Sequence, residues 1–234
     1  MSKRTKIMLK LTGEVFLDSN KRLSGEMVRS IIRQLKQLSK THQFGIVVGG
    51  GNFFRGSQHG KQLGIETAVG HQIGMLATMM NGLILKDLVE QQDLSAALFC
   101  AMPSPEIGEA ICQQTIHAAL ETRDVLIFSG GTGNPFFTTD TNAILRALQM
   151  GADVVWKGTN VDGVYDHDPR INKNACKLPF VSYDQAFNQQ LGIMDLTVYA
   201  LAYQHKKTVR VFDIFTEDAL ILVANDPTFG SIIQ

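Results

Sequence analysis

Charge of one sign, long apolar runs and clustered cysteines are what this sequence has least of. Its 22 Lys plus Arg balance 22 Asp plus Glu over 234 residues, so the formal net charge is zero. This balance argues against nucleic-acid binding through an overall basic surface and against a polybasic membrane anchor. With 44% apolar and 19% charged residues, the composition is that of a globular protein and argues against a disordered chain.

The three cysteines, Cys100, Cys112 and Cys176, show no CxxC spacing. We therefore expect reduced thiols in a cytosolic protein and no cysteine-based metal site. No apolar run approaches 18 residues, so no membrane span is expected. Lys10 and Glu14 interrupt the N-terminal apolar stretch too early for a signal peptide.

Short apolar runs alternate with longer segments of helical periodicity along the chain. The expected strands are residues 6–11, 44–48, 95–100, 124–128, 153–157, 208–212 and 230–233, and the expected helices are 24–40, with Ser24 as N-cap, 66–91, 107–120, 139–150, 183–189, 194–205 and 217–222. Buried strands that alternate with helices indicate an α/β fold with a mostly parallel sheet and helices on both faces. The length fits one large domain, or two small lobes that share a sheet.

Four features fall where predicted strands end: Lys10, the Gly49–Asn52 loop, the Gly130–Asn134 loop and the Lys157–Thr159 segment. Parallel strands joined by right-handed crossovers bring these ends to one edge, where such folds bind ligands. Glycine loops let backbone N–H groups approach an anion, and lysines add full charges. Each feature alone is also consistent with a tight turn or a solvated surface charge. Together they predict a site for more than one phosphate.

Common nucleotide motifs are absent. The Gly51–Gly56 spacing resembles a P-loop, but Ser57 and Gln58 follow where Lys and Ser/Thr are required. Neither glycine loop has the third glycine of a dinucleotide fingerprint, and no protein-kinase catalytic loop is present. Any phosphate-binding site in this chain is therefore expected to differ from these three motifs.

The motifs do resemble those of another family, the bacterial uridylate (UMP) kinases of the amino-acid-kinase superfamily. The resemblance covers nearly the whole chain in order, and its most specific segment is GTGNPFFTTD at 131–140; further segments are KLTGE (10–14), GGGNFFRG (49–56), GMLAT (74–78), ADVV (152–155), VDGVY (161–165) with Asp168–Pro169, and MDL (194–196). It implies a three-layer αβα sandwich, transfer of phosphate from ATP to UMP with Mg²⁺, and a cytosolic homohexamer in pyrimidine nucleotide synthesis.

The resemblance also implies roles for individual residues within a single domain spanning 1–234. The part from about residue 150 onward would mainly bind ATP, and the N-terminal part would mainly bind UMP and form oligomer contacts. The ATP side would comprise Lys10, Leu11, Thr12, Gly13, Gly51, Arg55, Thr159, Tyr165 and Asp168. The UMP side would comprise Gly50, His71, Thr132, Gly133, Asn134, Pro135, Phe136, Phe137, Thr138 and Thr139. Lys10, Asp140 and Lys157 would be catalytic, with Mg²⁺ carried by ATP and no direct protein ligand assigned.

These residue types suit phosphoryl transfer between nucleotides. A phosphate monoester is largely dianionic at neutral pH, so the acceptor needs positioning and charge neutralisation rather than a general base. We expect Lys10 and Lys157 to hold the transferred group and the Thr138 and Thr139 hydroxyls to face the acceptor phosphate. Asp140, a carboxylate among phosphates, would bind Mg²⁺, orient a lysine or cap its helix; the sequence leaves these three open.

Departures from the family pattern leave further questions. His71 stands where the family usually has an aspartate that accepts hydrogen bonds from the UMP ribose, and a neutral imidazole accepts only one. Phe136 and Phe137 would pack against uracil or against another subunit. Two other functions stay open: a superfamily kinase acting on a carboxylate or carbamate, and a regulator that senses uridine nucleotides. UTP would inhibit because it shares the uridine site.

Overall fold

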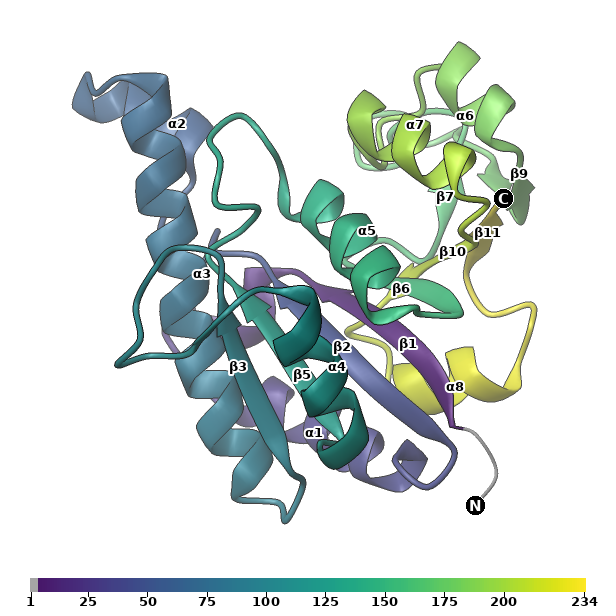
Figure 1. The fold of residues 1–234 in the computed structure, drawn as a ribbon. Coiled ribbons are helices and arrows are strands. Elements are labelled where there is room, and N and C mark those ends of the chain that lie inside the picture. Colours follow the sequence, from purple (N-terminus) through teal and green to yellow (C-terminus); the bar gives the residue numbers. More distant parts are fainter. Residues whose placement is uncertain (1–3) are drawn as a thin grey trace.

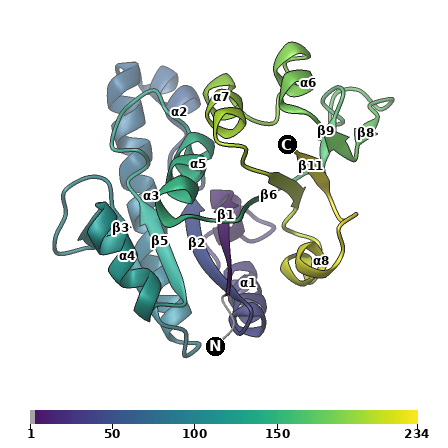
Figure 2. The same ribbon diagram turned by 45° about the vertical axis from the view of Figure 1, so that its right-hand side comes forward.

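The computed structural model describes residues 4–234, and its centre is a nine-stranded sheet (Figures 1 and 2). The strand order is β4-β3-β5-β2-β1-β6-β10-β11-β9, and all pairings are parallel except β10 with β11. The strands are β1 (Thr5–Leu11), β2 (His42–Val48), β3 (Ala96–Cys100), β4 (Glu109–Ala110), β5 (Val125–Ser129), β6 (Val154–Thr159), β9 (Phe180–Val181), β10 (Val209–Asp213) and β11 (Ser231–Ile233). The predicted mostly parallel sheet is confirmed.

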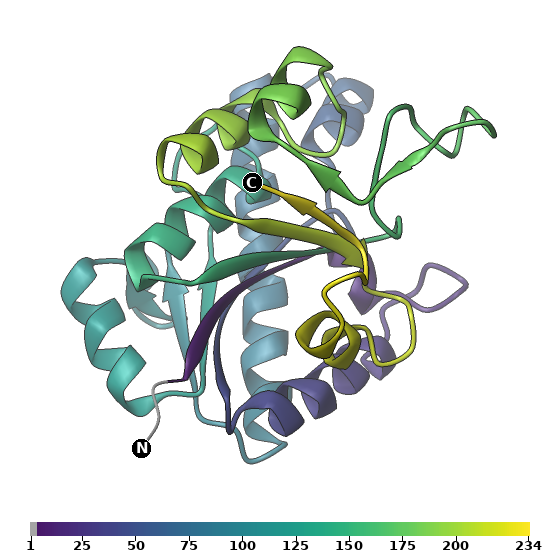
Figure 3. The same cartoon turned by 90° about the vertical axis from the view of Figure 1, so that its right-hand side faces the viewer.

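Helices cover both faces of this sheet, which makes three layers (Figure 3). One face carries α1 (Glu26–Leu38), α3 (Thr67–Glu90) and α8 (Ala219–Asn225). The other carries α4 (Gln113–Thr122), α5 (Thr139–Met150), α6 (Tyr183–Asn188) and α7 (Leu196–Gln204). The 3-10 helix η1 (Gly13–Phe16), α2 (Gly56–Leu63) and a small antiparallel pair, β7 (Val164–Tyr165) and β8 (Lys177–Leu178), complete the fold.

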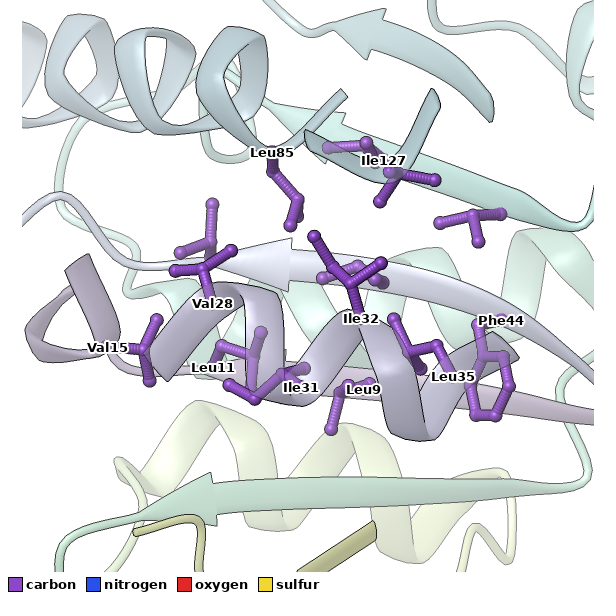
Figure 4. Packing of buried hydrophobic residues seen from close by; sticks show 14 of the residues in the cluster. Leu9, Leu11, Val15, Val28, Ile31, Ile32, Leu35, Phe44, Leu85 and Ile127 are labelled. Carbon is purple, nitrogen blue, oxygen red and sulfur yellow. The ribbon is translucent and has the colours of Figure 1, made fainter. Parts of the chain in front are cut away.

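The alternation of side chains along β1 divides the core into two halves. Leu9 and Leu11 point into the half beneath α1, α3 and α8, whereas Met8 points into the half beneath α5. Figure 4 shows Leu9 and Leu11 beside Ile31 and Leu35 of α1. Each of these side chains is fully buried, which stabilises the fold by about 1.5–3 kcal/mol per side chain. A parallel sheet buried on both faces explains the continuous apolar strands of the sequence.

Three local predictions differ from the structure. The helix expected from residue 107 begins at Gln113, because Glu109–Ala110 pairs with β3 as an edge strand. Ser24 is not the N-cap of α1; Gly25 is, although the Ser24 hydroxyl accepts a hydrogen bond from the Glu26 N–H at 3.3 Å. Helix α2, which was not predicted, is short and glycine-containing, so its periodicity is weak.

Helix α3 is long and apolar enough to meet the length and hydropathy criteria for a membrane span. Only 44% of its most apolar window is buried, and that buried side includes Met79, Leu85 and Val89 in the core. A core helix of a folded domain meets the same criteria, so we interpret α3 as part of the domain. Its outer side remains partly exposed and apolar.

Candidate active site

The four predicted phosphate-binding features meet at one edge of the sheet. β5, β2, β1 and β6 are adjacent and parallel, so their carboxyl ends lie side by side. Lys10 lies at the end of β1, Gly49 follows β2, Gly130 follows β5, and Lys157 lies near the end of β6. This convergence confirms the expectation drawn from the strand order.

Lys10, Lys157 and Asp140 form a compact charged cluster at this edge. Lys10 and Lys157 are directly paired in the register of β1 and β6, so their side chains leave the same face. The Lys10 ammonium lies 3.0 Å from Asp140 Oδ1, and the Lys157 ammonium lies 2.5 Å from Asp140 Oδ2. Lys157 also donates to the carbonyl of Ile193. All three side chains are largely buried, and together they carry one net positive charge.

The protonation states follow from this geometry. Burial would raise the pKa of Asp140, but the ammonium groups of Lys10 and Lys157 outweigh it and hold that pKa well below its usual range. Burial lowers the pKa of Lys157, and Asp140 opposes that shift. At neutral pH the carboxylate is ionised and orients both lysines.

The start of α5 shows that Asp140 is not a helix cap. Thr138 is the N-cap: its hydroxyl oxygen accepts hydrogen bonds from the backbone N–H groups of Asp140 and Thr141 at 3.1 and 3.3 Å. The same hydroxyl donates to Asp195 Oδ2 at 2.5 Å. In this conformation the Thr138 hydroxyl hydrogen is used by Asp195, and its contact with the acceptor phosphate stays a prediction.

Asp195 connects two helices near the site. Its carboxylate accepts hydrogen bonds from Thr138, Thr141 and Thr197 and caps α7 through the Val198 N–H. It therefore fixes the start of α5 against the start of α7. The sequence motif at 194–196 contains this residue, but only an N-cap pattern before an apolar helix could have indicated its position.

An asparagine pair holds the first glycine loop. The side chains of Asn52 and Asn81 exchange hydrogen bonds at 3.0 and 2.7 Å, and Asn81 also donates to the Gly49 carbonyl at 2.7 Å. Asn81 is completely buried. At Gly50 a Cβ atom would lie 2.8 Å from both Ala77 Cβ and the Gly74 carbonyl, so only glycine fits. No sequence pattern indicates this role for Asn81, a polar residue inside an apolar helix.

The second glycine loop depends on left-handed backbone. Gly130, Gly131 and Gly133 have φ values of 75°, 59° and 79°, which glycine adopts without strain. Phe136 also has a positive φ, 71°, which is unusual for an aromatic residue. Its exposed ring lies 5.3 Å from the ring of His71, centroid to centroid.

A cavity of about 400 Å³ lies on the side of Lys157, and residues between 157 and 193 line it. Of the residues assigned to ATP, Thr159, Tyr165 and Asp168 line it. The Arg170 guanidinium hydrogen-bonds the Asp168 carboxylate and lowers its pKa to about 2. The other ATP-side residues lie outside this lining, near the ends of β1 and β2: Lys10, Leu11, Thr12, Gly13, Gly51 and Arg55.

A second cavity, of about 330 Å³, lies between the two glycine loops, and residues between 50 and 139 line it. Its lining includes seven residues assigned to UMP: Gly50, His71, Thr132, Asn134, Phe137, Thr138 and Thr139. Gly133 and Pro135 do not line it, and Phe136 lines a third, neighbouring cavity instead. Thr139 lines the second cavity and Lys157 the first, so the cluster around Asp140 lies between them.

Arg55 is engaged in another contact. Its guanidinium pairs with Glu14 at 2.5 Å and is half-exposed.

Within residues 4–234 no group of three or more His, Cys, Asp or Glu side chains could hold a metal ion. The three cysteines are free thiols, as expected.

Comparisons with known proteins agree with this geometry. The model of the amino acid kinase family matches residues 5–213. The chain belongs to this family. Among its relatives, the uridylate kinase of Mycoplasma genitalium is 40% identical, with 99% of this chain and 96% of that protein covered. The uridylate kinase of Chromohalobacter salexigens is 41% identical, with 100% and 92% covered.

Solved structures of family members have the same fold. The crystal structure of UMP kinase from Ureaplasma parvum superposes with a TM-score of 0.93 at 30% identity and covers 99% of both chains. That of UMP kinase from Bacillus anthracis has a TM-score of 0.91 at 25% identity, with 98% and 96% covered. The αβα sandwich of an amino acid kinase and the resemblance to uridylate kinases are thus confirmed.

Proposed function

We propose that this amino acid kinase transfers the γ-phosphoryl group of ATP to UMP, giving ADP and UDP. The observation that carries the proposal is the pair of lysines that one carboxylate holds between two cavities. One cavity would hold the donor and the other the acceptor. The full-length similarity to uridylate kinases supports UMP as that acceptor.

The chemistry needs positioning more than proton transfer. A phosphate oxygen of UMP attacks the γ-phosphorus of ATP, a new P–O bond forms, and the bond to the ADP oxygen breaks in line. The acceptor is largely dianionic at neutral pH, so no general base is required. Lys10 and Lys157 would neutralise the transferring group, and Asp140 would keep both ammonium groups aimed at it.

The two cavities divide the substrates along the chain. The first cavity, with Thr159, Tyr165 and Asp168, would take the adenine nucleotide. The second, with Gly50 and the loop around Thr132, would take UMP, and UTP would inhibit there. This division supports an N-terminal part that binds UMP and a part from about residue 150 that binds ATP.

Mg²⁺ would bind together with ATP rather than at a preformed site of protein ligands. Since the described residues lack a cluster of metal-ligating side chains, phosphate oxygens would supply most of its ligands. Bound there, the ion would neutralise charge on the donor phosphates. Both oxygens of the Asp140 carboxylate already face ammonium groups, Oδ1 that of Lys10 and Oδ2 that of Lys157, so this carboxylate would orient the lysines rather than serve as the main ligand of the ion.

The outer side of α3 supports self-association. Its partly exposed apolar residues recur at helical spacing: Val69, Leu76, Met80, Leu83 and Ile84. A contiguous apolar stripe on a helix is typical of a protein interface. We therefore propose that the chain forms the homohexamer expected from its resemblance and acts in the cytosol, in pyrimidine nucleotide synthesis. Sedimentation equilibrium of the purified protein would give six times the chain mass; a monomer would contradict it.

Phosphorus NMR of the reaction mixture tests the proposed reaction. With ATP, Mg²⁺ and UMP we expect the signals of UDP and ADP to appear together in equal amounts. An acyl or carbamoyl phosphate formed from a carboxylate or carbamate acceptor, without UDP, would favour the other type of amino acid kinase. Binding of UMP without any product would favour a nucleotide-sensing regulator.

A further inference from the structure

The buried side of α5 carries a guanidinium that has no acidic partner among the described residues. Arg146 is 4% exposed. Its Nε donates to Asn142 Oδ1 at 3.0 Å, and its terminal nitrogens donate to Gln149 Oε1 at 2.6 Å and to the Gly131 carbonyl at 3.4 Å. All three acceptors are neutral. Burying a charge without a counter-charge is unfavourable, so its retention needs an explanation.

The charge of Arg146 persists at neutral pH. Burial lowers the pKa of Arg146 to about 10, and no carboxylate opposes this shift. The surrounding polar network is also incomplete, since Asn142 Nδ2 is buried and has no acceptor within residues 4–234. A partly satisfied buried network destabilises a fold, which makes a purely structural role a poor explanation.

The position of Arg146 connects it to the second cavity. Gly131, whose carbonyl it contacts, lines that cavity in a left-handed conformation. The residues lining the cavity include no Asp, Glu, Lys or Arg, and His71 is the one ionisable side chain among them. Arg146 therefore places a fixed positive charge behind the loop of a cavity whose lining includes no Lys or Arg.

We propose that Arg146 is a positioning residue for the acceptor: it holds the Gly131 carbonyl away from the cavity and supplies the positive charge that the acceptor's phosphate dianion balances. This inference rests on the proposed function. Lys10, Asp140 and Lys157 carry one net positive charge for the transferring group. Arg146 would supply a second positive charge on the acceptor side, where the cavity lining includes no Lys or Arg.

The test compares Arg146→Gln with Arg210→Gln. Arg210 is a matched control because its guanidinium also donates only to neutral groups, the carbonyls of Val223, Asp226 and Phe229 beside α8. Initial rates give the KM for UMP and for ATP, and competition against UMP gives the inhibition constant of uridine, which lacks the phosphate. Arg146→Gln is expected to raise the KM for UMP about tenfold or more, the effect of losing a charged interaction. The KM for ATP and the inhibition constant of uridine are expected to stay within about twofold of wild type, because neither ligand loses a contact in this variant.

Arg146→Lys keeps the charge and loses the planar fork, so its KM for UMP is expected to lie between those of wild type and Arg146→Gln. This second variant decides the matter should Arg146→Gln not fold. An unchanged KM for UMP in either folded variant overturns the proposal. So does an equal loss of UMP and uridine binding, which a distorted loop would cause. Wild-type protein that makes no UDP contradicts the proposed function instead, whatever the variants do.

Discussion

Lys10 and Lys157 are register partners in adjacent parallel strands, and Asp140 lies between their ammonium groups at 3.0 and 2.5 Å. Two like charges on neighbouring strands repel, so the carboxylate is needed to keep both in place. The cluster is built from β1, β6 and the first turn of α5. It thereby links the cavity on the Lys157 side with the one beside Thr139.

Lys10→Ala is expected to lower kcat by about 100-fold or more, as removal of one preorganised charged donor does. The fold should persist, since the Lys10 side chain contacts Asp140 and contributes little to the apolar core. Steady-state rates and thermal unfolding check both statements. Lys6→Ala, four residues earlier on the same strand, is the control, since the Lys6 ammonium donates only to the Met150 carbonyl among the described residues. Near-normal turnover by Lys10→Ala would show that Lys10 is not a catalytic residue.

Asp140→Asn should reduce kcat more than it raises the KM for UMP. The amide has almost the same shape, but it no longer carries the negative charge that orients Lys10 and Lys157. The ratio of the two effects, from initial rates at varied UMP, is the measurement. Equal losses in kcat and in UMP binding would indicate a structural role at the start of α5 instead.

The same pair of proteins gives a pH test of stability. Because the pKa of Asp140 is held below its unfolded value of about 3.9, the folded state releases that proton more readily. Its stabilising contribution is thus fully present above the unfolded pKa and is lost as pH falls through the folded one. Urea unfolding of wild type and Asp140→Asn should show a constant stability difference from pH 8 to 5 and a shrinking one below about pH 4. A difference that stays constant down to pH 3 would mean that the carboxylate does not stabilise the cluster.

Sequence reasoning reached the sheet, its helices on both faces and the edge where the ligands would bind. These features could be predicted because buried parallel strands have continuous apolar runs and because Lys10, Gly49 and Lys157 lie at or near the carboxyl ends of their strands. Sequence reasoning could not place Asn81, Arg146 or Asp195, since the partners that tie them to the site lie 15 to 57 residues away in the chain: Gly49, Gly131 and Thr138. The sequence likewise could not distinguish the three roles considered for Asp140, because its contacts with Lys10 and Lys157 are visible only in the structure.

Asn81→Ala should destabilise the first glycine loop. It leaves the Gly49 carbonyl and the Asn52 side chain without their buried donor, at about 1–3 kcal/mol for each unsatisfied group. Chemical denaturation measures the loss, and initial rates should show a raised KM for UMP, since Gly50 lines its cavity. Asn225→Ala is the control, because exposed Asn225 only bonds the Ile221 carbonyl within its own helix. A loss of stability no larger than that of the control would show that Asn81 does not hold the first glycine loop in place.

The most direct test of the central claim is the rate of ADP release with ATP and Mg²⁺ across several acceptors: UMP, dUMP, CMP and a few carboxylates. We expect turnover with UMP at about 1–100 per second, the usual range of kinases, and none with the carboxylates. No ADP release with any nucleotide acceptor would contradict the account, because the lysine pair and both cavities would then serve some purpose other than phosphoryl transfer to UMP.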